Sequence, residues 1–440
     1  MSAQLVFISL FLGLISGPQR VELQAGPAIK SVHILLDGRQ VAALQQPPWR
    51  ATIDFGTSIT PGKLVAAGYD GEGREVARVE QFVNLPRPAA EFVIALQNDA
   101  DGVPRSAELR WEHLMAMKPV RSSLTVDGQA VPLDQLTRAR LPRLDMNHAH
   151  VIAAEMHFED GFSARRELVV GGAVSDTVDA DLTPLGVRQS TAMPHATPGD
   201  CFTSDGSPVR LAAIEESQAL VIFVLDPDPR EGIQSLNPKY SPGAFWNGAA
   251  DLRHLIPLDP GTRMRILWPV AKRFKTTSNA SSVMFTPSKD IDSSASGLVW
   301  LLTRFYDQPV SDDAPRQIAD AVGVAGLNAI TGAHRRAVVL ILSRYKDSGI
   351  HDSATVRNYL ASIGVPLFVW SLSGPHPDLR DAWGVIDDVS SPQKLKAAAD
   401  RLRANLATQR VAWVATDPLT ALRIQPTGEC GITPLAHTQE

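Results

Sequence analysis

The sequence predicts a multidomain protein in which two antiparallel β-sandwich domains precede an α/β domain with a doubly wound, mostly parallel sheet. The chain has 440 residues, more than one compact core usually serves. Apolar runs suited to buried strands alternate with helical segments after about residue 185, as in a doubly wound sheet. Before that point Asp-Gly pairs, which favour tight hairpin turns, recur between short alternating segments. They lie at residues 37–38, 70–71, 101–102, 127–128 and 160–161.

Composition and charge exclude two classes of protein. Hydrophobic residues make up 44% of the chain and charged residues 20%, so a packed interior is expected and wholesale disorder is not. Lys and Arg total 42 against 47 Asp and Glu, a net charge of −5. Because this charge is small and dispersed, we expect no nucleic acid partner.

The first 17 residues are typical of a signal peptide. An apolar run over residues 5–15 has the length of a signal-peptide core and about half that of a membrane span. No Lys or Arg precedes it and residues 16–19 form no clean cleavage site, so an uncleaved anchor or a wrongly chosen start stays open. We expect an exported protein (periplasmic, cell-surface or secreted) whose mature chain begins between Pro18 and Gln24. No later run is long enough to span a membrane.

The two β domains are assigned to residues 18–86 and 87–185, with a junction at residues 82–92 that contains Pro86 and Pro88. Period-two alternation predicts strands in both domains. The first domain has them at residues 31–36, 40–44, 51–56 and 63–70, and the second at 91–96, 107–114, 123–128, 150–158 and 164–172.

A polar, turn-rich segment over residues 186–217 is interpreted as a linker, followed by the α/β domain over 218–420 and a C-terminal tail over 421–440. Ser391 and Pro392 are good N-cap and first-turn residues for the last helix. Ligands are expected at the carboxyl ends of the strands. Predicted strands cover 219–225, 263–270, 336–342, 366–372 and 410–416, and predicted helices 296–306, 315–330, 354–364 and 392–409.

One part of the α/β domain resembles a known family. RRAVVLILSRYKDSG (335–349), a helix and GVPLFVWSLSG (364–374) are similar to the fourth strand, helix and fifth strand of von Willebrand factor type A domains. ALVIFVLDPD (219–228) resembles the first strand and its metal loop. With the preceding immunoglobulin-like β domains, residues 20–435 resemble the exported VWFA-related proteins of the Acidobacteria type. The resemblance implies adhesion or protein binding, often through a divalent cation.

The metal loops depart from the family pattern, which uses Asp-x-Ser-x-Ser, a Thr and an Asp as hard oxygen ligands. Arg230 occupies a Ser position, Arg316 falls near the Thr position, and Arg344 replaces the second Asp. We therefore expect a degenerate metal site and no cofactor. The resemblance places on the binding face Asp226, Asp228, Arg230, Arg316, Ser343 and Arg344.

An Arg344 fork paired with the Asp226 carboxylate is one hypothesis for what replaces the cation. In the alternative, Arg344 points to solvent and Asp226 caps the following helix.

Other motifs favour structural interpretations. Residues 292–296 spell Asp-x-Ser-x-Ser, but no buried strand precedes them, and a helix cap is expected there. Residues 97–102 with Glu108 match part of a calcium loop, although a hairpin turn fits better. His148 and His150 share a strand face without an identifiable third ligand. Searches for serine-hydrolase, zinc-protease, phosphate-loop and dinucleotide motifs return nothing.

The two cysteines, Cys201 and Cys430, are a disulfide candidate in an exported chain, while two separate thiols stay open. Together these observations favour an exported, non-enzymatic protein-binding or adhesion protein whose protein ligand is not identifiable from the sequence. Two alternatives stay open: a metal-dependent hydrolase using Asp226 and Asp228, and an envelope-assembly factor.

Overall fold

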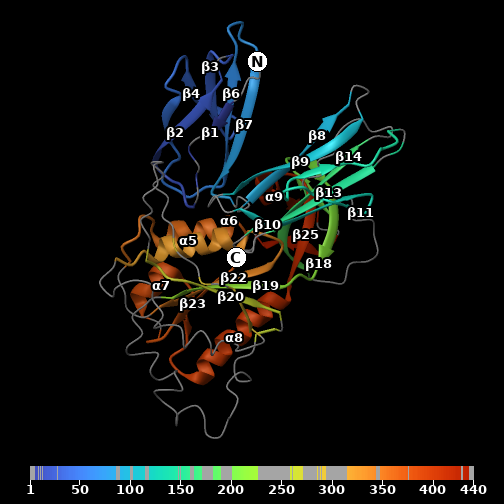
Figure 1. Ribbon diagram of the computed structural model, residues 1–440. Coiled ribbons are helices and arrows are strands. Elements are labelled where there is room, and N and C mark those ends of the chain that lie inside the picture. Colours follow the sequence, from blue (N-terminus) through green and yellow to red (C-terminus); the bar gives the residue numbers. More distant parts are fainter. Residues whose placement is uncertain are drawn as a thin grey trace. The chain divides into compact units, whose positions relative to one another are not determined.

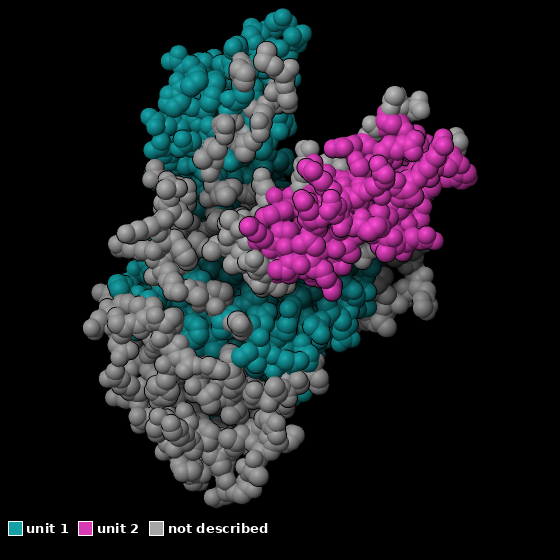
Figure 2. All heavy atoms as spheres, viewed as in Figure 1, with its two compact units in different colours: residues 1–86, 182–440 teal, residues 87–181 magenta. Residues whose placement is uncertain are grey.

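The computed structural model divides the chain into two compact units, residues 1–86 with 182–440 and residues 87–181 (Figure 2). It describes residues 5–7, 9, 11, 13–26, 28–85, 90–99, 103–113, 118–146, 148, 150–158, 163–170, 182–189, 201–225, 258–259, 261–270, 285, 288, 290–293, 315–342, 347–374, 376–427 and 430–435.

The first unit begins with a β-sandwich built on alternating strands. Its core lies between two sheets, where Val21 and Ile53 of one sheet pack with Ile34 and Leu64 of the other. One sheet has the order β1-β2-β5: β1 (Leu5–Phe7), β2 (Pro18–Ala25) and β5 (Arg50–Asp54). The other has the order β4-β3-β6-β7: β3 (Ser31–Leu36), β4 (Arg39–Leu44), β6 (Gly62–Tyr69) and β7 (Glu75–Val83).

The segment expected to be a signal peptide packs in this first unit. β1 pairs antiparallel with β2, and the apolar side chains of Phe7, Phe11 and Ile15 are buried in the sandwich core. Leu14 joins a different core, that of the α/β domain. Removal of residues 1–17, which stays a prediction, would take these side chains out of both cores.

The second unit is another antiparallel sandwich, with Phe92 and Leu109 of one sheet facing Ile152 and Met156 of the other. Its sheets have the orders β12-β9-β8 and β11-β10-β13-β14. The strands are β8 (Ala90–Asn98), β9 (Pro104–His113), β10 (Pro119–Val126), β11 (Gln129–Val131), β12 (Arg138–Arg140), β13 (His150–Phe158) and β14 (Ser163–Val170).

The segment interpreted as a linker is not a simple connection, because strands in and beside it pair with strands near the C-terminus. β15 (Leu182–Gln189), β18 (Leu211–Glu215), β25 (Gln409–Ala415) and β27 (Ile432–Pro434) form an antiparallel sheet of order β18-β25-β15-β27. β16 (Phe202–Ser204), β17 (Ser207–Val209) and β26 (Gln425–Pro426) form a second small sheet. Turn-rich composition concealed these strands. β16 and β17 pair with each other as a local hairpin, whereas β15 and β18 pair with β25, about 200 residues later in the chain.

The α/β domain contains one mostly parallel sheet of order β21-β20-β19-β22-β23-β24, with only β21 antiparallel to its neighbour. Its central strands are buried on both faces, which explains their continuous apolar sequences. The strands are β19 (Ala219–Leu225), β20 (Arg263–Leu267), β21 (Ile291–Asp292), β22 (Arg335–Leu342), β23 (Leu367–Ser371) and β24 (Asp387–Asp388).

Helices cover both faces of this sheet (Figure 1). α5 (Ile318–Ala329) and α6 (Ser353–Ser362) pack on the face that carries Ile222 and Val338. α8 (Pro392–Ala407) packs on the face of Phe223 and Val339. Two shorter helices are α7 (Pro377–Trp383) and α9 (Pro418–Leu422). Among the described helices none combines the length and apolar character needed to span a membrane.

The elements expected from the sequence for this domain can be compared with those in the structure. The predicted strand 410–416 forms as β25 but belongs to the antiparallel sheet, because it pairs with β15 on one side and with β18 of the supposed linker on the other. The predicted helix 296–306 lies outside the described residues.

α8 begins as predicted, with the Ser391 hydroxyl accepting the Lys394 N–H at 3.4 Å. Cys201 and Cys430 form a disulfide, with 5.6 Å between their Cα atoms, so the pairing left open by the sequence is present.

Candidate binding face at the carboxyl end of the parallel sheet

The candidate site lies where the two central strands of the parallel sheet end. β19 and β22 are parallel neighbours, with Leu225 opposite Ile341. The chain continues from β19 to β20 and β21 on one side, and from β22 to β23 and β24 on the other. The strand order therefore reverses between β19 and β22. In open α/β sheets ligands bind outside the carboxyl ends of the strands at such a reversal.

Of the residues predicted for the binding face, Arg316 is described. It is 2% exposed, and the N–H of the following Gln317 donates to the Pro269 carbonyl at 2.8 Å, just beyond β20. This hydrogen bond fixes the start of α5, and with it Arg316, at the carboxyl end of the sheet. The other predicted residues lie outside the described residues: Asp226, Asp228, Arg230, Ser343 and Arg344.

The loop after β22 is fastened to the first turn of α5. The Asp347 carboxylate accepts the backbone N–H groups of Ile318 and Ala319 at 2.9 and 2.8 Å. These are donors that a helix N-terminus otherwise leaves without partners. Ser348 donates through both its N–H and its hydroxyl to the Arg316 carbonyl, at 2.7 and 2.6 Å. The two loops that meet at this end of the sheet therefore hold each other by protein atoms.

A second set of contacts extends this fastening inward. Asp320 is fully buried in α5, and its carboxylate accepts the N–H groups of Ile350 and His351 at 2.7 and 3.2 Å. It also contacts His351 Nδ1 at 2.6 Å, while His351 Nε2 lies 2.7 Å from the Ser16 hydroxyl. Sequence reasoning missed this set. The signal that could have found it is Asp320 itself, a single carboxylate in an apolar helix, which needs partners when buried.

The Ser16–His351–Asp320 arrangement has the hydrogen-bond order of a serine-hydrolase triad, which also requires donors for the oxyanion. The backbone N–H groups of the two residues that flank Ser16 already donate hydrogen bonds within the protein, so neither is free to bind an oxyanion. Ile15 donates to Asn84 Oδ1 at 2.7 Å, and Gly17 donates to the Gly56 carbonyl at 2.6 Å. The arrangement therefore fits a structural connection between the segment before β2 and the α5–α6 pair better than a catalytic centre.

Further contacts join the first sandwich to the same two helices. The Tyr359 hydroxyl of α6 donates to the Asn84 carbonyl at 2.9 Å in a buried position, and burial raises the pKa of Tyr359. A Cβ at Gly323 of α5 would lie 2.5 Å from Leu14 Cδ1, so only glycine permits this close packing. The loops at the carboxyl end and the first sandwich thus share α5 and α6 as a common support.

The two other sequence motifs that resemble cation sites, at residues 292–296 and 97–102, belong to elements other than the two loops at the carboxyl end of the parallel sheet. Asp292 lies in β21 opposite Arg263, the first residue of β20, and therefore at the amino end of the sheet. The partial calcium loop lies in the β8–β9 hairpin, where the Asp99 carboxylate accepts the Val103 N–H at 3.0 Å and pairs with Arg105 at 2.6 Å.

The histidines of the second unit contact carboxylates. His150 Nδ1 lies 2.7 Å from Asp127 Oδ2, and this hydrogen bond raises the pKa of His150. His148 lies 3.0 Å from Asp145. Within the described part of the chain, no three His, Cys, Asp or Glu side chains gather as a metal site would require.

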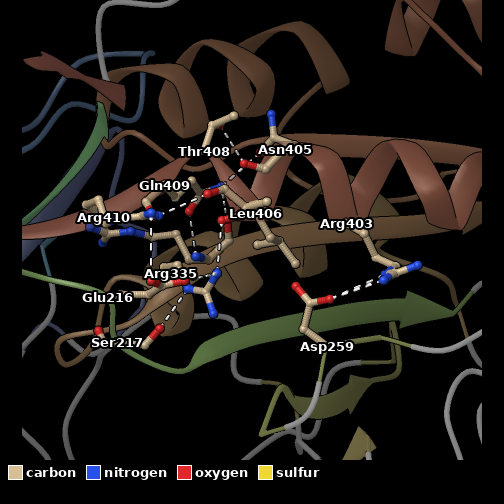
Figure 3. A network of polar contacts seen from close by, with 12 residues as sticks. Glu216, Ser217, Asp259, Arg335, Arg403, Asn405, Leu406, Thr408, Gln409 and Arg410 are labelled. Carbon is tan, nitrogen blue, oxygen red and sulfur yellow. Dashed lines mark hydrogen bonds and ion pairs between the residues drawn. The ribbon is translucent and has the colours of Figure 1, made fainter. Parts of the chain in front are cut away.

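The opposite, amino end of the sheet is closed by a polar network (Figure 3). Arg335 donates to the carbonyls of Ser217 and Leu406 at 2.7 and 3.3 Å, which ties β22 to the end of α8. Glu216 lies between Arg335 and Arg410, at 3.9 and 3.7 Å. Because these groups satisfy one another, the network shown in Figure 3 is structural, and the carboxyl end is the better candidate for the binding face predicted from the sequence.

No protein-family model matches the chain, and no curated protein matches it. Solved structures with similarity include the fibronectin(III)-like modules of CbhA from Clostridium thermocellum, at 12% identity and a TM-score of 0.16, covering 39% of this chain and 95% of that one. The central fibronectin-III array of RIM-binding protein gives 12% identity and a TM-score of 0.23, covering 48% and 80%.

A third similar structure is proximal thread matrix protein 1 from the mussel byssus, with a zinc-occupied MIDAS motif. It has 14% identity and a TM-score of 0.26, and the match covers 44% of this chain and 50% of that protein. All three TM-scores are low, so the fold described above rests on the strand order and packing of this chain.

Proposed function

We propose that the chain is an exported, non-enzymatic binding protein with a von Willebrand factor type A-like α/β domain that engages a protein ligand at the carboxyl end of its parallel sheet. The observation that carries the proposal is the reversal of strand order between β19 and β22. The next residues along the chain from these two strands are Asp226 and Ser343, which begin the two loops predicted to bind.

Binding without a metal ion is part of the proposal. Cation sites of this kind need hard oxygen ligands, and the sequence places Arg230, Arg316 and Arg344 at those positions. The burial of Arg316 and the Asp347 cap on α5 support a face whose geometry is set by protein groups. In this proposal an Arg344–Asp226 pair supplies the local charge balance that a cation would supply elsewhere.

A melting experiment tests the proposal that the binding face contains no metal ion. The disulfide-bonded chain is heated in EDTA and in excess Mg²⁺, as wild type and as Asp226→Ala. We expect equal melting temperatures of the wild-type protein in the two buffers, because no ion binds the folded state selectively. A Mg²⁺-dependent rise that Asp226→Ala abolishes would show that the loop after β19 is a metal site.

A capture experiment tests the face. The wild-type chain, Asp226→Ala, Arg344→Ala and the control Lys396→Ala are each used to retain proteins from envelope extract and from external fluid of the native host. Lys396 is 60% exposed on α8 and belongs to neither of the two loops. We expect a partner retained by wild type and control and lost from both face variants. Equal retention by all four chains would place binding elsewhere, and the source of the partner separates envelope assembly from adhesion.

A further inference from the structure

Two arginines near the amino end of the parallel sheet, Arg336 of β22 and Arg188 of β15, each have a buried Nε atom without a hydrogen-bond partner among the described residues. Arg336 follows Arg335 in β22 and is 4% exposed. Its side chain makes no hydrogen bond or ion pair to any described residue, and its Nε is buried without a partner. Arg335 is the natural comparison, because two carbonyls accept from its guanidinium (Figure 3). Burial lowers the pKa of Arg336 to about 10, and it remains a cation near neutral pH.

The structure makes specific room for this guanidinium. A Cβ on Gly186 of β15 would lie 2.6 Å from an Arg336 terminal nitrogen and 3.0 Å from its Nε. The same Cβ would lie 2.8 Å from Leu435 Cδ1, so the surroundings include an apolar wall. Gln409 holds the backbone of Arg336 on both sides, accepting its N–H at 2.8 Å and donating to its carbonyl at 3.0 Å. The position of Arg336 is therefore fixed.

Arg188 is the second cation. It follows Gly186 by two residues in β15, so its side chain leaves the same face of the strand toward Arg336. Its Nε is also buried without an acceptor among the described residues, although the residue as a whole is only half-buried. Arg188 is therefore a second cation on the Gly186 face of β15, and it is partly open to solvent.

The neighbouring charges do not offset this pair. Asp290 is engaged by Arg265 and Arg263, at 2.6 and 3.5 Å. Burial, with smaller contributions from the charges of Arg263 and Arg336, lowers the pKa of His334 to about 4, so its ring is neutral near pH 7. An unpaired buried cation is costly to the folded state, so a bound anion is the expected partner.

We propose that Arg336 and Arg188 form a binding site for a small tetrahedral oxyanion, phosphate or sulfate, between β22 and β15. Each guanidinium offers its Nε edge, which carries two parallel donors suited to neighbouring oxygens of such an anion. Two guanidinium edges from different strands fit the oxygens of a tetrahedral anion, which point in different directions, better than the two coplanar oxygens of a carboxylate. The site lies at the other end of the sheet from the proposed ligand-binding face and stands independently of it.

Calorimetric titration of the full disulfide-bonded chain tests the site. Sodium phosphate, sulfate and acetate are each titrated at constant ionic strength in chloride, into wild type, Arg336→Met, Arg188→Met and the control Arg78→Met. Arg78 is 53% exposed in β7 and lies in the first sandwich. We expect one phosphate or sulfate per wild-type and control chain, with binding at least about tenfold weaker in both site variants. No saturable binding to wild type, or equal binding to Arg336→Met, would overturn the proposal.

Melting temperatures give a second readout. In chloride alone Arg336→Met should melt above wild type, because it removes a buried charge without a partner. Saturating phosphate or sulfate should raise wild type and leave this variant unchanged. A lower melting temperature of Arg336→Met in chloride would show that the guanidinium already has its partner in the protein and would contradict the site. If that variant fails to fold, Arg188→Met decides, and unchanged anion binding in it would refute the pair.

Discussion

Asn84 connects three parts of the first unit, and its replacement should be strongly destabilising. The side chain accepts the Ile15 N–H at 2.7 Å and donates to the carbonyls of Ile15 and Thr60 at 2.8 and 2.9 Å. The residue is 3% exposed, and its φ of 56° is one that Asn tolerates better than Ala. Removing it therefore breaks three hydrogen bonds at a buried position, and an Ala there adds backbone strain.

The magnitude follows from these contacts. At about 1 kcal/mol for each hydrogen bond, Asn84→Gly should lose about 3 kcal/mol. Asn84→Ala should lose about 1 kcal/mol more, because glycine adopts a positive φ without strain. In a chain that starts at Pro18 the two bonds to Ile15 do not exist. There Asn84→Gly should cost only about 1 kcal/mol, from the bond to Thr60.

Hydrogen exchange read by mass spectrometry on peptides from residues 18–85 measures the local opening free energy of the first sandwich. The four proteins to compare are the two variants, each with and without residues 1–17, against their parents. A loss below about 1 kcal/mol for Asn84→Ala in the full chain would refute the packing of Ile15 on Asn84. Equal losses with and without residues 1–17 would show that Ile15 contributes nothing.

Three further outcomes are expected. Replacing Cys201 and Cys430 by Ser removes a disulfide that closes a loop with a sequence separation of 229 residues. The first unit should lose up to about 4–5 kcal/mol of unfolding free energy, measured by urea unfolding. An unchanged urea midpoint would contradict a disulfide in the protein as isolated. The hydrogen bond from His150 to the Asp127 carboxylate raises the pKa of His150, so the pair stabilises the second unit below the ordinary histidine pKa of about 6.5, and this contribution disappears as pH rises through the raised value. In an NMR titration the pKa of His150 should fall toward the ordinary value in Asp127→Asn, and an unshifted wild-type titration would be inconsistent with the contact. Intact mass of protein from the native host should show a chain that begins between residues 18 and 24, whereas a soluble product that keeps residues 1–17 would rule out processing.

The sequence alone determined those elements whose burial leaves a local pattern. β13 coincides with the predicted strand 150–158 because one of its faces is buried and the other is not, which produces strict alternation. β19 coincides with 219–225 because the strand is buried on both faces, which produces a continuous apolar run. The start of α8 was readable from Ser391, since a cap acts within one turn.

Only the tertiary structure decided which elements face each other. β25 was recognised as a strand, yet its partners are β15 and β18, about 200 residues earlier in the chain, and periodicity carries no information about partners. The contact between Ser16 and His351 spans 335 residues, and nothing local in either segment indicates it. Likewise, the sequence does not distinguish Arg336, whose Nε is buried without a partner among the described residues, from the neighbouring Arg335, whose guanidinium donates to two carbonyls. A local pattern reports that a face is buried, whereas the groups that cover the face depend on the path of the whole chain.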